Sequence, residues 1–259
     1  MILQHAALRP LLPALLVVLL WLAALAAPAA AQQRANDRLT PVDLELAFVV
    51  DASGSIDDAE MRLQRQGYMD ALTHPRVQSA IAGGFLQSIA VAYIEFAGSD
   101  CTQMAVGWTR IGDKASAEAF GRRILAAERN FCFGGNAISE ALAFAAASID
   151  ANEFEGTRRV IDLSGDGPNT IGPPVELVRD GILARRITIN ALAIDRPSMP
   201  DLPEYFQASI IGGPGAFMIR AESRQTFAEA ILRKLIREIA DRTPAERRRA
   251  EVSPPRSRD

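Results

Sequence analysis

The chain has 259 residues, of which 49% are hydrophobic and 23% are charged, and its formal net charge at pH 7 is −3. The length allows one large α/β domain or two small ones. The mildly acidic balance argues against a nucleic-acid partner and agrees with cation binding.

Residues 1–31 predict a secretory signal peptide. Arg9 precedes a long apolar run, and this run ends in the small residues Ala29 to Ala31, just before polar residues begin at Gln32. A basic start, an apolar middle and a small-residue exit are the features of such a peptide. A membrane-anchoring helix is the alternative, because the run is long enough to span a bilayer. We expect cleavage near Gln32, a periplasmic or extracellular protein, and no membrane span in the mature chain.

Strands and helices are expected to alternate along the rest of the chain. The expected strands are 44–50, 89–96, 105–111, 159–163, 187–194 and 216–219, the third of them at a sheet edge. The expected helices are 57–71, 116–127, 137–149, 174–184 and 225–240. This alternation predicts an α/β fold with a doubly wound, mostly parallel sheet and helices on both faces. We place the domain at 44–240, a linker at 32–43 and a disordered, charged tail at 241–259.

Two cysteines, Cys101 and Cys132, occur in the chain. In an exported protein a lone pair of cysteines most simply forms a disulfide, which would stabilise the fold by roughly 3–4 kcal/mol on the chain-entropy model. The alternative is a reactive thiol or a metal-binding pair. Two thiolates without a nearby histidine make a poor zinc site, so we predict the disulfide.

Three oxygen-bearing side chains follow the first predicted strand, in the sequence DASGS. They are Asp51, Ser53 and Ser55, at alternate positions. A serine here could simply cap the next helix, and Asp57 and Asp58 suit the first turn of that helix. One capping residue would be enough for that purpose. Three hard oxygen ligands suit Mg²⁺ instead, with Mn²⁺ or Ca²⁺ as competitors.

Two further loops are expected at the same edge of the sheet. Asp166, in SGDG, follows the strand 159–163, and Asn136, in FGGN, precedes the helix 137–149. Ligands of doubly wound sheets bind at the carboxyl ends of the strands, near the point where the strand order reverses. We therefore expect all three loops to converge on one site.

The three loops resemble those of the von Willebrand factor type A family. The metal-ion-dependent adhesion site of that family combines a DxSxS loop, a threonine from a second loop and an aspartate from a third. DASGS matches the first loop fully, SGDG resembles the third, and GGNAISEAL is similar to the second, with Asn136 where threonine is usual. The resemblance covers about Val42 to Ala240. It is closest to a secreted bacterial branch of unknown function.

This resemblance implies a metal-dependent protein-interaction module of the adhesion type, with a Rossmann-like sheet, rather than an enzyme. It implies direct ligation by Ser53 and Ser55, contact by Asp51 and Asp166 directly or through water, and a neutral oxygen from Asn136. An acidic side chain of a partner protein would complete the coordination of the ion.

Other functions remain open from the sequence. The ion could serve only to hold the loops together, or the site could be vestigial. A serine hydrolase would need Ser53 or Ser164 as its nucleophile, but neither lies in a G-x-S-x-G elbow. The mature chain has a single histidine, His74, after the first predicted helix, which is a poor position for a triad base.

Overall fold

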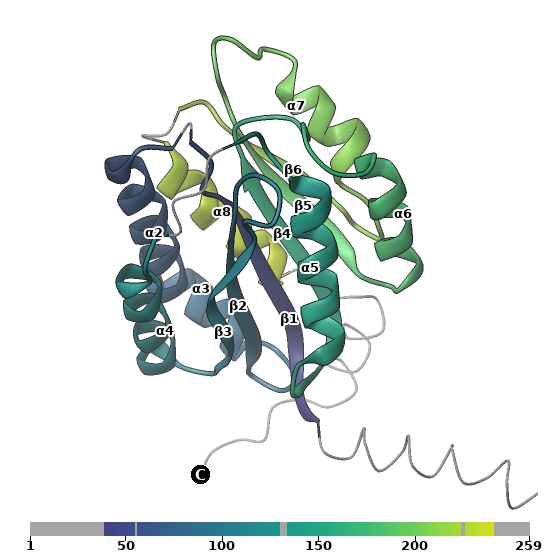
Figure 1. The fold of residues 1–259 in the computed structure, drawn as a ribbon. Helices are drawn as coiled ribbons and strands as arrows, with labels where there is room; N and C mark the ends of the chain where they lie inside the picture. The colour runs from purple at the N-terminus through teal and green to yellow at the C-terminus, as the bar shows by residue number, and fades with distance from the viewer. Residues whose placement is uncertain (1–38, 55, 130–133, 224–225, 241–259) are drawn as a thin grey trace, which may run out of the picture. The chain divides into compact units, whose positions relative to one another are not determined.

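A computed structural model describes residues 39–54, 56–129, 134–223 and 226–240 (Figure 1). The strands are β1 (Thr40–Asp51), β2 (Ile89–Phe96), β3 (Gln103–Ile111), β4 (Phe154–Gly165), β5 (Thr188–Ile194) and β6 (Met218–Ala221). The helices are α2 (Asp58–Thr73), α3 (Pro75–Ala82), α4 (Lys114–Ala126), α5 (Ile138–Ala151), α6 (Val175–Ala184), α7 (Leu202–Tyr205), the π-helical turn η1 (Phe206–Ile210) and α8 (Phe227–Ala240).

The six strands form one sheet in the order β3-β2-β1-β4-β5-β6. The pairs β1–β2, β4–β5 and β5–β6 are parallel, and β3 runs antiparallel to β2 at the edge. The predicted doubly wound, mostly parallel α/β sheet is therefore confirmed. The strand order reverses between β1 and β4, so the carboxyl ends of these two strands flank the position where such sheets bind ligands.

Helices cover both faces of the sheet, with α2, α3, α4 and α8 on one side and α5 and α6 on the other (Figure 1). A hydrophobic core lies on each face of the sheet. Alternate residues of β1 pack into one core or the other, because successive side chains of a strand point to opposite faces. Phe48 and Val50 pack with Tyr68 of α2, whereas Ala47 and Val49 belong to the core of α5. Burial on both faces explains the continuous apolar run of this central strand.

The first strand begins earlier than the sequence predicts, and this corrects the boundary of the linker. β1 begins at Thr40, so it includes residues that we assigned to the linker 32–43. Val42 is fully buried, and the carboxylate of Asp43 accepts a hydrogen bond of 2.9 Å from the backbone N–H of Leu86. These contacts extend the strand beyond its apolar run.

A short helix, α3, was not predicted. It begins at Pro75, whose fixed φ suits the first helical position. The ring nitrogen Nδ1 of His74 accepts a hydrogen bond of 3.1 Å from the backbone N–H of Arg76, which caps the helix. His74 therefore has a structural role at the start of α3.

A charged cluster lies inside the core between the sheet and α8. Lys234 is fully buried, and its Nζ lies 2.6 Å from Oδ1 of Asp162 on β4 and 3.1 Å from Oε2 of Glu238. Asn190 on β5 donates a hydrogen bond of 2.7 Å to the other oxygen of Glu238. Burial raises the pKa of Asp162 well above its usual range, although Lys234 opposes this effect. One ammonium group thus contacts two buried carboxyl groups and ties α8 to the sheet.

Candidate metal centre

Asp51 is the last residue of β1 and lies at the central position of the site. It is 1% exposed, and its Oδ1 accepts a hydrogen bond of 2.8 Å from the backbone N–H of Ser53. This hydrogen bond turns the chain back at the strand end. The other oxygen, Oδ2, is buried and has no hydrogen-bond partner among the described residues.

The first loop brings serine close to this carboxylate. Ser53 is 3% exposed, and its carbonyl oxygen accepts a hydrogen bond of 2.9 Å from the backbone N–H of Ile56. Its hydroxyl is also a hydrogen-bond partner of Asp51. Ser55, the third predicted ligand of this loop, lies outside the described residues.

The second loop carries Asn136 and is fixed at two points. The backbone N–H of Ala137 donates a hydrogen bond of 2.8 Å to the carbonyl of Ala97, just beyond the end of β2. The backbone N–H of Asn136 donates one of 2.8 Å to Oγ1 of Thr170, and its carbonyl accepts one of 2.9 Å from the N–H of Thr170. Asn136 itself is 9% exposed.

The third loop places Asp166, which is fully buried, directly after β4. The flanking glycines are needed for close approach. A Cβ on Gly165 would lie 3.3 Å from Oδ2 of Asp51, and a Cβ on Gly167 would collide with the side-chain amide of Asn136. The structure therefore brings Asp51, Asn136 and Asp166 together from three loops, as the sequence predicts.

Asp51 and Asp166 form a pair of buried acids whose negative charge is not fully compensated by nearby positive charge. Burial, followed by the nearby charge of Asp166, raises the pKa of Asp51 from 3.8 to about 6, although hydrogen bonds from Ser53 and from the backbone of Asp166 oppose the shift. Two buried carboxylates side by side favour either a proton or a cation between them.

The donor set fits a hard divalent cation. In the described ranges, no group of three or more His, Cys, Asp or Glu side chains could hold a metal ion. An ion at this site would therefore rely on serine and asparagine oxygens in addition to Asp51 and Asp166. Such neutral and anionic oxygen ligands suit Mg²⁺. The unpartnered Oδ2 of Asp51 is the oxygen that an ion would satisfy.

Sequence reasoning missed Arg196, the residue after the strand-end acid Asp195. Its NH1 lies 3.6 Å from Oδ1 of Asp166. Asn169 and Thr170 were also missed, although both belong to the SGDGPN loop region. Oδ1 of Asn169 accepts a hydrogen bond of 2.9 Å from the backbone N–H of Ser139, in the first turn of α5. The only sequence signal for these three residues is their position in loops that follow strands.

The remaining polar residues of the sequence prediction have structural roles. Asp57 caps α2 through a hydrogen bond of 2.8 Å from the backbone N–H of Glu60, and Asp58 lies in the first turn, as predicted. Ser164, one of the two serines considered as a nucleophile, is 1% exposed and lies 3.2 Å from the hydroxyl of Tyr68.

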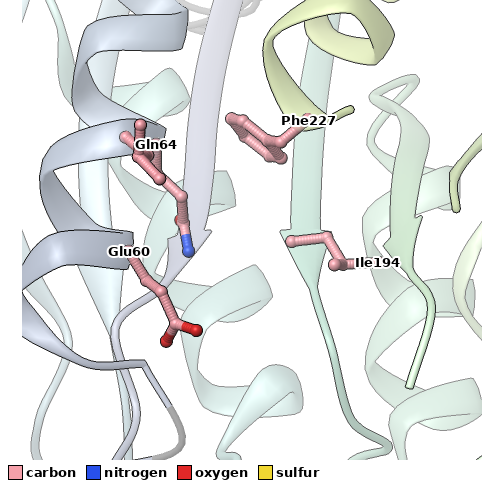
Figure 2. Close-up of a pocket in the computed structure, with 5 residues that line it drawn as sticks. Glu60, Gln64, Ile194 and Phe227 are labelled. Atoms are coloured by element: carbon pink, nitrogen blue, oxygen red, sulfur yellow. The ribbon is translucent and has the colours of Figure 1, made fainter. Parts of the chain in front are cut away.

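A narrow crevice lies between α2, β5 and α8 (Figure 2). Figure 2 shows Glu60 and Gln64 of α2 opposite Ile194 and Phe227. The crevice has no room for a water molecule. One carboxylate oxygen of Glu60 accepts a hydrogen bond of 2.9 Å from the N–H of Asp57, within the helix cap. The crevice is therefore a packing feature rather than a binding site.

Three other predictions concern residues that the structure does not describe. Cys132 lies outside the described ranges, so the pairing of Cys101 with Cys132 stays a prediction. The signal peptide at 1–31 and the tail at 241–259 also lie outside them. Among the described helices, none is long and apolar enough to cross a membrane.

The pH dependence of stability tests the acid pair. In the ion-free protein, Asp51 has a folded-state pKa of about 6 and an ordinary value of 3.8. Folding binds a proton between these values, so stability is fully present below pH 3.8 and is lost as the pH rises through 6. We expect a loss of about 2–3 kcal/mol.

Chemical denaturation in EDTA at several pH values would measure this loss. Other carboxylates also titrate in this range, so the measured quantity is the difference between wild type and Asp51→Asn. The free energy of unfolding of wild type, relative to that of Asp51→Asn, should fall as the pH rises. A constant difference from pH 4 to pH 7.5 would contradict the predicted raised pKa of about 6 for Asp51.

The fold is that of von Willebrand factor type A domains. Proximal thread matrix protein 1 from the mussel byssus, with a zinc-occupied MIDAS motif, is similar with a TM-score of 0.57 and 14% identity, over 78% of this chain and 49% of that chain. The pilus adhesin SpaC from Lactobacillus rhamnosus GG is similar with a TM-score of 0.57 and 17% identity, over 78% of this chain and 31% of that one. The SpRpn10 VWA domain gives a TM-score of 0.53 and 12% identity, over 73% and 94% of the two chains.

These identities show a common fold only. The chain matches about half of the mussel protein and about a third of the adhesin. Comparison with curated proteins gave no match. The chain belongs to the family described as "Protein of unknown function (DUF1194)", which matches residues 41–243. This agrees with the predicted resemblance to a von Willebrand factor type A branch of unknown function.

Proposed function

We propose that this domain is a metal-dependent protein-binding module of the adhesion type. A divalent cation, Mg²⁺ in our proposal with Mn²⁺ or Ca²⁺ as competitors, would be held by Asp51, Ser53, Ser55, Asn136 and Asp166. The observation that carries the proposal is the buried Oδ2 of Asp51, which has no hydrogen-bond partner in the described part of the chain and lies beside a second buried acid.

The chemistry of this ligand set explains why it would bind an acidic partner. Serine hydroxyls and an asparagine amide are neutral, so Asp51 and Asp166 alone provide negative charge. When bound, the ion supplies a Lewis-acidic position for an oxygen ligand. Water-mediated contact by the aspartates would leave the ion under-neutralised, so it would attract a carboxylate of a partner protein.

The similar proteins support the same type of function. One is described with a zinc-occupied MIDAS motif, and another is a pilus adhesin. Asn136 remains the departure from the family pattern. We propose that its amide oxygen replaces the usual threonine hydroxyl, because the loop places its side chain against Gly167 of the acid loop.

The cellular location belongs to the same proposal. A signal peptide at 1–31 would direct export of the protein. In the oxidising environment outside the cytoplasm, Cys101 and Cys132 would form a disulfide. Partner proteins would then be periplasmic or extracellular. The acidic group on such a partner is the chemical feature that we expect the ion to recognise.

Chelation and a single hydroxyl deletion test the proposal together. The tagged protein is used to capture partners from the native cell envelope with Mg²⁺ or with EDTA. We expect a Mg²⁺-dependent partner that is lost with EDTA and with Ser53→Ala. Ser79→Ala, on the exposed side of α3, is the matched control and should behave as wild type.

Two results would contradict the proposal. Binding that is unchanged by EDTA and by Ser53→Ala would remove the role of the ion. Mg²⁺ that raises the melting temperature, without any carboxylate completing its coordination, would favour an ion that only stabilises the loops.

A further inference from the structure

Arg196 is a cationic side chain with unused hydrogen-bonding capacity beside the candidate metal centre. It lies in the segment between β5 and α7, and its side chain is 32% exposed, whereas that of Asp166 is fully buried. The separation of 3.6 Å between its NH1 and Oδ1 of Asp166 gives an ion pair without a hydrogen bond. Within the described ranges, no hydrogen bond from this guanidinium is observed. Its planar set of N–H donors is therefore available to another anion.

Arg196 also lines a hollow beyond the carboxyl end of β5. The hollow has a volume of about 240 Å³, which is room for several water molecules. Its other walls include Asp195, Pro197, Met199, Arg220 and Glu222. The Nε of Arg220 donates to both carboxylate oxygens of Asp195, at 2.7 and 2.6 Å. Arg220 is thus already paired, and Arg196 is the guanidinium of the hollow that can accept a new anion.

We propose that Arg196 is a second anchor for the partner's carboxylate, beside the ion. This inference rests on the proposed function. An ion held by Asp166 would compensate the charge of this carboxylate, so the guanidinium of Arg196 would be available to another anion. Arg196 would then bind the partner's carboxylate beside the ion. Charge-assisted hydrogen bonds from a planar fork to a carboxylate are stronger and more directional than those from an ammonium group.

If Arg196 anchors the carboxylate, its substitution should weaken carboxylate binding without weakening Mg²⁺ binding. Arg196→Gln removes a positive charge near the ion, so Mg²⁺ should bind at least as tightly as in wild type. The same change removes the second anchor, so a carboxylate should bind the Mg²⁺-loaded protein about tenfold more weakly. Arg196→Lys keeps the charge without the fork and should give an intermediate carboxylate affinity.

Acetate is the probe for this experiment. Mg²⁺ affinity is measured by calorimetry, and acetate binding to the Mg²⁺-saturated protein is followed by NMR titration. Arg110→Gln is the control, because Arg110 is exposed and pairs with Ala90 near the start of β2, at the opposite edge of the sheet. It should leave both affinities unchanged.

The outcomes separate this inference from the function on which it rests. If wild type takes up Mg²⁺ but acetate binds Arg196→Gln and wild type equally well, the second anchor is wrong and the metal centre stands. If Arg196→Gln loses Mg²⁺ affinity, Arg196 supports the acid loop and the inference is also wrong. If wild type binds no Mg²⁺, both proposals fail.

Discussion

Asp166→Asn is expected to lower Mg²⁺ affinity by a factor of about 100, at the upper end of losses measured when groups that support a metal site are removed. The substitution keeps the shape of the side chain and removes its charge. Asp166 is fully buried beside Asp51, so no solvent screens the missing charge. The ion would then lose one of the two acids that neutralise it. Calorimetric titration of the purified, oxidised protein with MgCl₂ gives the affinity directly.

The control is an acid of the same type at a remote, exposed position. Asp180 on α6 has a side chain that is 63% exposed, so Asp180→Asn should bind Mg²⁺ as wild type does. Circular dichroism of both variants would establish that they are folded. Mg²⁺ affinity that is equal in Asp166→Asn and wild type would show that this acid does not contribute to the site.

Lys234→Met is expected to lower the free energy of unfolding by about 3–5 kcal/mol near pH 7.5, as when one partner of a buried ion pair is removed. Methionine fills a similar volume, so the main loss is the charge. Asp162 and Glu238 would then be buried without the ammonium group that contacts both. Burial raises the pKa of Asp162 well above its usual range. Protonation of Asp162 removes one buried negative charge, so the loss should shrink as the pH falls.

Denaturation in urea at pH 7.5 and at pH 5 measures both parts of this prediction. Lys114→Met is the control, because the side chain of Lys114 is 69% exposed and its i,i+4 ion pair with Glu118 contributes little. A loss in Lys234→Met below about 1 kcal/mol, or one that grows at lower pH, would contradict the view that Lys234 compensates the buried acids.

Much of the fold could be predicted because its strands are continuous apolar runs. LELAFVV of β1 and ITINALAI around β5 could only be buried on both faces, which requires a sheet between helices. In β4, prediction from apolar runs finds only part of the strand. Its first six residues, Phe154–Arg159, are mostly part-exposed, and only the buried half was predicted. In this part of β4 the backbone N–H of Gly156 donates a hydrogen bond of 2.6 Å to Oε1 of Glu45 on β1, a contact that composition does not indicate. The short helices α3 and α7 were missed for the related reason that four to eight residues give no clear period.

The candidate site was predicted in part for a similar reason. Asp51, Asn136 and Asp166 each follow or precede a recognisable element, so topology alone brings them to one edge of the sheet. The contacts of Asp166 with Arg196 and of Asn136 with Thr170 join residues 30 or more positions apart. No local pattern marks such pairs. Glycine stands at 165 and 167, and the structure identifies the groups that approach these positions, Asp51 and Asn136.

The sequence by itself determined which side chains stand at the ends of the strands, because apolar runs that stop at polar residues are a property of the local chain. Only the tertiary structure decided the electrostatic state of those side chains. The pKa of Asp51 depends on its burial and on the charge of Asp166, which arrives from a distant strand. The placement of Arg196 beside Asp166 has the same origin. Dielectric environment and charge separation are properties of three-dimensional packing, and no reading of neighbouring residues supplies them.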